Sequence, residues 1–83
     1  MRSVFMGSRR LSGETLSYHL LIEEVEDLGE NYGVLLEGFG QTEAIPGITV
    51  VQNRALSLLE QLRHGGAVTP ASLRDVVEDW LLI

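Results

Sequence analysis

Residues 15–26 read TLSYHLLIEEVE, and large hydrophobic side chains alternate along this stretch. A period of two predicts a β-strand from Thr15 to about Glu26 with one buried face. The face expected in the core carries Leu16, Tyr18, Leu20 and Ile22. The opposite face carries Ser17, His19, Leu21 and Glu23.

A second hydrophobic run, residues 32–39, follows a polar stretch, residues 27–31, that contains a glycine. The polar stretch is typical of a turn, so the two runs predict a β-hairpin with Val34 and Leu36 facing the core. Residues 43–48 are a candidate third strand. Pro46 has no N–H to donate, so this strand would lie at a sheet edge or be interrupted there. We therefore expect an antiparallel sheet of two or three strands.

The second half of the chain changes to helical spacing. Hydrophobic residues recur every three or four positions over residues 51–64, which predicts an amphipathic helix that ends before Gly65. Thr49 and Gln52 have the spacing of a capping box for its start. We expect His64 to bond free carbonyl groups in its last turn.

A second helix is predicted after Thr69, a good N-cap, and Pro70, which fits a first helical position. Its hydrophobic face carries Leu73, Val76, Val77, Trp80 and Leu81. The predicted fold is therefore α+β: an antiparallel two- or three-stranded sheet followed by two helices packed on one face, ββ(β)αα.

Length and charge limit what this fold does. Eighty-three residues suit one small domain. Twelve acidic residues oppose six arginines, there is no lysine, and the net charge of −6 repels a phosphate backbone. The absence of cysteine excludes disulfides, thiolate metal sites and cysteine nucleophiles.

Residues 1–13 are expected to be a flexible tail that contains Arg2, Arg9 and Arg10, and residues 14–83 a single domain. Neither a secretory signal, with its apolar run of roughly 7–15 residues, nor a membrane-spanning run is apparent. We therefore expect a cytoplasmic protein without membrane contact.

Several segments resemble a family. Tyr32-Gly33-Val34 after the hairpin turn, Leu58-Leu59 in the first helix, and Val68-Thr69-Pro70 leading into LRDVVEDWL at residues 73–81 are similar to a small bacterial family of unknown function found in Firmicutes. The resemblance covers residues 17–82 and is strongest in the C-terminal helix. It implies no activity and supplies no functional residues.

The chain shows no recognisable catalytic, cofactor or metal site. Asp75, Glu78 and Asp79 lie on one helical surface without the glycine-containing loop of a calcium site, so they indicate a solvated face. His19 and His64 lack short-range metal-ligand spacing. We expect no catalysis, no cofactor and no small-molecule substrate.

The second sheet face is the strongest functional feature, because helices on one side leave the other side exposed. Its candidate interface residues are Leu21, Val25, Leu35 and Phe39. Either this face contacts a partner, or Leu35 and Phe39 fold back under the loop that contains Ile45 and Ile48, or under the tail. The leading hypothesis is a non-catalytic interaction module that acts as a homodimer or with a protein partner. The alternative is a nucleic-acid-associated regulator that uses the N-terminal arginines.

Overall fold

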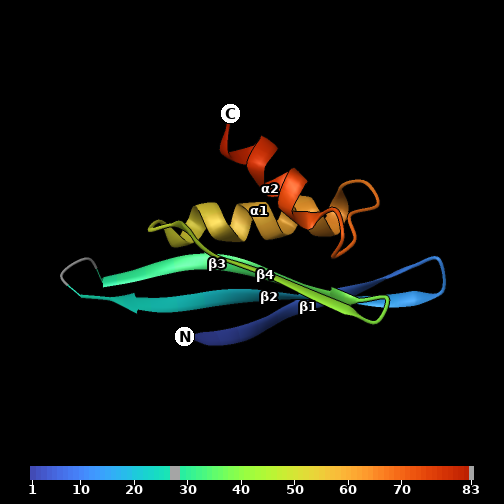
Figure 1. The fold of residues 1–83 in the computed structure, drawn as a ribbon, viewed down its shortest axis with the longest axis horizontal. Coiled ribbons are helices and arrows are strands. Elements are labelled where there is room, and N and C mark those ends of the chain that lie inside the picture. The colour runs from blue at the N-terminus through green and yellow to red at the C-terminus, as the bar shows by residue number, and fades with distance from the viewer. Residues whose placement is uncertain (27–28, 83) are drawn as a thin grey trace.

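The computed structural model describes residues 1–26 and 29–82. Within these residues, four strands form one antiparallel sheet, and two helices follow it in the chain. The elements are β1 (Arg2–Leu11), β2 (Glu14–Val25), β3 (Gly29–Gly38), β4 (Gln41–Thr49), α1 (Gln52–His64) and α2 (Leu73–Leu81). Both helices lie on the same side of the sheet (Figure 1). The α+β class is confirmed, but the expected number of strands was too low.

The first unexpected strand is β1. The sequence predicted a tail over residues 1–13, whereas Arg2–Leu11 pairs with β2 and forms an edge of the sheet. A tight turn joins the two strands, with Ser12 and Gly13 at φ of 51° and 81°, as a type I′ hairpin requires. A bulge between Phe5 and Gly7 shifts the register by one residue. This shift breaks the period of two, which is why the pattern did not show a strand.

The candidate strand over residues 43–48 is present as β4 and is longer than expected. β4 pairs with β3 after a two-residue turn in which Phe39 and Gly40 have φ of 53° and 71°. It is a continuous strand at the other edge of the sheet, and its register shifts near Pro46, opposite Gly33. The missing N–H of Pro46 therefore removes no regular ladder bond. In the predicted turn over 27–31, residues 27–28 lie outside the described residues, and residues 29–31 belong to β3.

The core lies between the sheet and the helices. Every sheet residue expected there is buried: Leu16, Tyr18, Leu20, Ile22, Val34 and Leu36. Tyr32 joins them, and the helices contribute Ala55, Leu58, Leu59, Leu62, Leu73 and Val77. The alternation along β2 and the helical spacing therefore identified most of the core.

The ends of α1 differ from the sequence expectation. Its N-cap, Val51, makes no side-chain capping bond, because the Thr49 hydroxyl accepts from the Val51 N–H at 3.1 Å instead of forming the predicted box. At its C-terminus, Arg9 Nη1 donates to the carbonyl oxygens of Arg63 at 2.8 Å and Gly65 at 3.2 Å. The helix end is thus capped by a side chain from β1.

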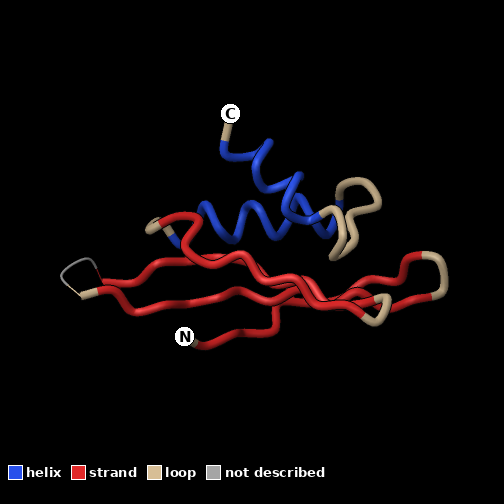
Figure 2. Tube along the Cα trace, viewed as in Figure 1, coloured by secondary structure: helices blue, strands red, loops and turns tan. Residues whose placement is uncertain are grey.

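The second helix starts three residues later than Pro70. Its N-cap is Ser72, whose hydroxyl accepts from the Thr69 N–H at 3.0 Å, so residues 69–72 form a turn before α2. The chain between the helices is a loop (Figure 2). α2 rises away from the sheet towards the C-terminus, and Leu81 is half-exposed rather than part of the core. Neither described helix is long and apolar enough to cross a bilayer.

Candidate interaction surface

The side of the sheet turned away from the helices carries no covering element among the described residues (Figure 1). We call this side the open face. The strand register and the alternation of side chains place three rows of residues in its middle. These rows are Ser8, Ser17, Glu37 and Thr42; Phe5, His19, Leu35 and Ala44; and Ser3, Leu21 and Gly33.

The middle row is the most hydrophobic and crosses all four strands. Phe5 pairs with His19, His19 with Leu35, and Leu35 with Ala44. The rings of Phe5 and His19 meet edge to face, with centroids 5.6 Å apart. Phe5 remains 60% exposed, the largest exposed aromatic surface among the described residues. The row is therefore a hydrophobic stripe that the chain itself leaves accessible.

The four predicted interface residues do not form a single patch. Leu21 and Leu35 lie in adjacent rows of the open face, but Leu21 is buried and Leu35 half-buried. Val25 is paired with Gly29 at one end of the sheet, whereas Phe39 lies in the turn at the other end. Only Leu35 and its neighbours thus belong to the exposed stripe.

Sequence reasoning missed the contribution of Phe5, His19 and Ala44 to this stripe. Phe5 had been assigned to a tail, although the hydrophobic Val4, Phe5 and Met6 were a signal for a short strand. Ile45 and Ile48 pack against the core on the helix side, so the loop does not cover Leu35. The N-terminal segment adds a side chain to the open face instead of covering it.

His19 has an unusual environment within the stripe. Its Nε2 atom is buried and has no hydrogen-bond partner among the described residues, and the nearest carboxylate oxygen of that part of the chain, Oε1 of Glu37, lies 3.7 Å away. The side chain is 19% exposed. Leaving a buried polar atom without a partner costs free energy, so a contacting molecule with a donor or acceptor here would relieve this cost.

The remaining candidate groups lie elsewhere. His64 is at the end of α1, on the helix side of the sheet, and pairs with Glu60 at 3.0 Å. Asp75, Glu78 and Asp79 are exposed on α2. Among the described residues, no three histidine, cysteine, aspartate or glutamate side chains gather as a metal site.

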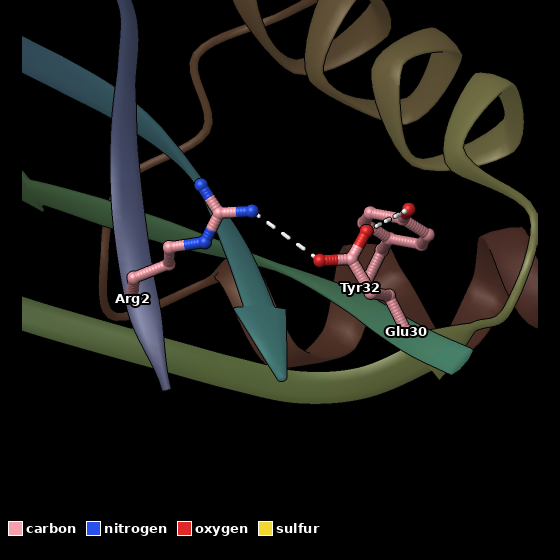
Figure 3. A network of polar contacts seen from close by, with 3 residues as sticks. All are labelled: Arg2, Glu30 and Tyr32. Carbon is pink, nitrogen blue, oxygen red and sulfur yellow. Dashed lines mark hydrogen bonds and ion pairs between the residues drawn. The ribbon is translucent and has the colours of Figure 1, made fainter. Parts of the chain in front are cut away.

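The N-terminal arginines contact the body of the protein. Arg2 pairs with Glu30 at 3.3 Å, and the same carboxylate accepts a hydrogen bond from the Tyr32 hydroxyl at 3.0 Å (Figure 3). That hydrogen bond, with burial and the negative charge, raises the pKa of Tyr32, while Arg2 opposes the rise. Arg10 donates to the Gly13 carbonyl at 2.9 Å. With Arg9 on the helix end, the three cations are spread over separate sites.

Comparison with known proteins gives a family but no activity. No curated protein and no solved structure matches the chain. A model of a family of unknown function, DUF6514, matches residues 3–82, which include all the strands and both helices described above except the first residue of β1. The chain therefore belongs to the family of unknown function DUF6514.

Proposed function

We propose that this protein is a non-catalytic interaction module whose open face binds a second copy of the same chain. The observation that carries the proposal is the stripe of Phe5, His19, Leu35 and Ala44, which crosses the whole sheet without a covering helix. An exposed hydrophobic stripe on one side of a small sheet is typical of a contact surface.

The area of the open face fits a modest homodimer. Strands of ten residues are about 33 Å long, and four strands are about 19 Å wide, so the face covers about 600 Å². Two such faces would bury about 1,200 Å² together, at the lower end for a specific complex. The dimer should therefore be reversible and depend on protein concentration.

Charge along the open face also favours two copies in opposite orientation. Arg10, paired with Thr15, lies four residues along β2 on one side of His19, and Glu23 lies four residues on the other side. A two-fold axis that crosses the strands at the His19 row would bring the Arg10 end of one copy to the Glu23 end of the other. Opposite charges then flank a hydrophobic centre.

The nucleic-acid alternative receives less support. Arg2 is paired with a carboxylate, while Arg9 and Arg10 donate to backbone carbonyls, so each has a contact within the chain. The net charge of −6 opposes phosphate binding as well. We further propose that the protein acts in the cytoplasm and that its family is the Firmicutes family resembled by the C-terminal helix.

Light scattering after size-exclusion chromatography, over a range of protein concentrations, tests this proposal. Phe5 is 60% exposed, so replacing it with glutamate should leave the fold intact. The change places a charge in the centre of the proposed contact in both copies. We expect Phe5→Glu to weaken dimerisation at least about tenfold, since burying an aromatic side chain contributes about 1.5–3 kcal/mol. Ser57→Glu, on the exposed side of α1, is the matched control and should not change association.

Leu35→Glu is a second variant in the same stripe and should behave like Phe5→Glu. Circular dichroism confirms that each variant is folded. A wild-type protein that stays monomeric at every concentration would contradict the second copy as the occupant. A dimer that both stripe variants retain would place the contact on another surface.

A further inference from the structure

A small cavity lies on the helix side of the sheet, opposite the open face. Its volume is about 240 Å³, and it lies between β1, β2 and α1. Its lining residues are Met6, Tyr18, Leu56, Leu59, Glu60 and Arg63. Hydrophobic side chains therefore form part of the wall, and a hydroxyl, a guanidinium and a carboxylate form the rest.

The bulge in β1 shapes one side of this cavity. Met6 is the extra residue between the pairs Phe5–His19 and Gly7–Tyr18. Gly7 has a φ of 136°, and a Cβ atom there would lie 3.2 to 3.5 Å from three guanidinium atoms of Arg63. These nearly equal distances mean that the guanidinium plane packs against the backbone of Gly7. A side chain at position 7 would crowd it.

Two arginines near the cavity have no carboxylate partner. Among the described residues, the carboxylates that form ion pairs contact Arg2, Arg74, His19 and His64, and none contacts Arg9 or Arg63. Arg9 spends one nitrogen, Nη1, on the two carbonyls at the end of α1, which leaves its other N–H groups free of those bonds. Of the six arginines, only Arg2 and Arg74 contact a carboxylate among the described residues, and Arg9 and Arg63 are the two of the other four that lie near the Tyr18 hydroxyl.

The third polar group is the hydroxyl of Tyr18. The residue is 1% exposed, and its O–H has no acceptor among the described residues. Burial raises the pKa of Tyr18, while the charge of Arg9, a hydrogen bond from the Arg9 guanidinium to the hydroxyl oxygen, and the charge of Arg63 oppose this rise. Both cations are thus close enough to act on the hydroxyl oxygen, and its O–H remains available as a donor at neutral pH.

We propose that this cavity binds a small carboxylate that carries a short hydrophobic chain. The carboxylate accepts hydrogen bonds from the Tyr18 hydroxyl and the guanidinium of Arg63, with the charge of Arg9 adding to the attraction. Met6, Leu56 and Leu59 contact the hydrophobic chain. The ligand would complete the hydrogen bonding of a buried hydroxyl and neutralise a cation that lacks a partner.

Glu60 weakens the attraction of the cavity for anions. Its carboxylate lines the cavity but is 63% exposed and pairs with His64 at 3.0 Å, so it is partly neutralised and turned towards solvent. The hydrophobic wall of Met6, Leu56 and Leu59 distinguishes between anions, because phosphate has no hydrophobic part to pack against it. A monocarboxylate with a hydrophobic chain is therefore the better match to this cavity.

Titration of the ¹⁵N-labelled protein with sodium butyrate, followed by NMR, tests the proposal. We expect amide shifts at Met6, Gly7, Tyr18 and Arg63 at millimolar to tens of millimolar butyrate. Inorganic phosphate at equal ionic strength should bind more weakly, and 1-butanol should not produce the same shifts. Absence of shifts with butyrate, or equal shifts with phosphate, would overturn the proposed ligand class.

Variants separate a specific site from general attraction to positive charge. Arg63→Gln and Tyr18→Phe should each weaken butyrate binding about tenfold, because each removes a donor to a charged group. Arg74→Gln removes the same charge from an exposed pair with Glu43 and should leave binding unchanged. Glu60→Gln should tighten it. Equal losses in Arg63→Gln and Arg74→Gln would contradict a built site.

The cavity and the open face lie on opposite sides of the sheet, so their tests are independent. Tyr18→Phe should not alter dimerisation, and Phe5→Glu should not abolish butyrate binding. Tyr18→Phe removes a buried hydroxyl whose O–H has no acceptor among the described residues, so the unliganded variant should remain folded. A lost butyrate response in this folded variant would therefore not be explained by unfolding.

Discussion

Replacing Gly33 with alanine should separate β4 from β3. A Cβ atom at this position would overlap the carbonyl oxygen of Ile45 and lie 2.6 Å from the Cα of Pro46. Both are backbone atoms, so no side-chain rotation relieves the overlap. The bulge of β4 must instead move away from β3.

The expected cost follows from what this movement disrupts. The pairs on either side of the bulge, Tyr32 with Thr49 and Val34 with Ile45, would lose about two or three ladder hydrogen bonds at about 1 kcal/mol each. Ile45 and Ile48 would also lose packing against the core. We therefore expect the free energy of unfolding to fall by about 3 kcal/mol. This is a large part of the roughly 4–12 kcal/mol that is typical for a domain of this length.

Thermal and urea unfolding, followed by circular dichroism, measure this change. A loss of about 3 kcal/mol corresponds to a fall in Tm of about 12–24 °C for a domain of this size. Gly66→Ala is the matched control, since no atom of the described residues lies within 4 Å of a Cβ at that position and its backbone does not have a positive φ. Its free energy of unfolding should stay within about 0.5 kcal/mol of the wild type. If Gly33→Ala and Gly66→Ala have the same Tm and the same free energy of unfolding, the close approach of β4 to Gly33 does not stabilise the bulge.

Three further perturbations test the core, the helix cap and a buried tyrosine. Leu73 is fully buried, so Leu73→Ala should lower the free energy of unfolding, measured by urea unfolding, by about 2–5 kcal/mol. A loss below about 1 kcal/mol would mean that α2 is not packed on the core. Arg9→Met should lower the free energy of unfolding by about 1.5–3 kcal/mol and speed amide exchange at Gly65, because Arg9 donates to two carbonyls at the end of α1. An unchanged exchange rate at Gly65 would contradict this cap. Burial raises the pKa of Tyr18, so the folded protein keeps a proton that the unfolded chain loses, and stability should fall as the pH rises above about 10. Unfolding at a series of alkaline pH values should show a shallower fall in Tyr18→Phe, and an equal slope would refute this contribution.

The sequence predicted well those elements in which the spacing of hydrophobic residues matches the set of buried residues. The alternation from Leu16 to Ile22 identified the buried face of β2, and the spacing from Ala55 to Leu62 identified the buried side of α1. In both, each side chain is either towards the core or away from it, without a register shift inside the pattern.

The elements that were missed contain a bulge. In β4, the register shift near Pro46 interrupts the pattern, and only part of the strand could be proposed. In β1, Met6 is the extra residue, and three arginines made the segment look like a solvated tail. The cap on α1 was missed for a different reason: Arg9 lies 54 residues before Arg63, and a local pattern does not report a contact between such distant positions.

The bulge in β1 also connects the two candidate sites. Without it, strict alternation would place residue 9 on the same face as Phe5, because both have odd numbers. The extra residue Met6 shifts this order, so Phe5 points to the open face while Arg9 points to the helix side and caps α1. A single strand thereby supplies the exposed aromatic ring of the proposed dimer contact and one cation of the proposed carboxylate site. The segment that the sequence presented as a tail is therefore the part of the chain on which both proposals depend most.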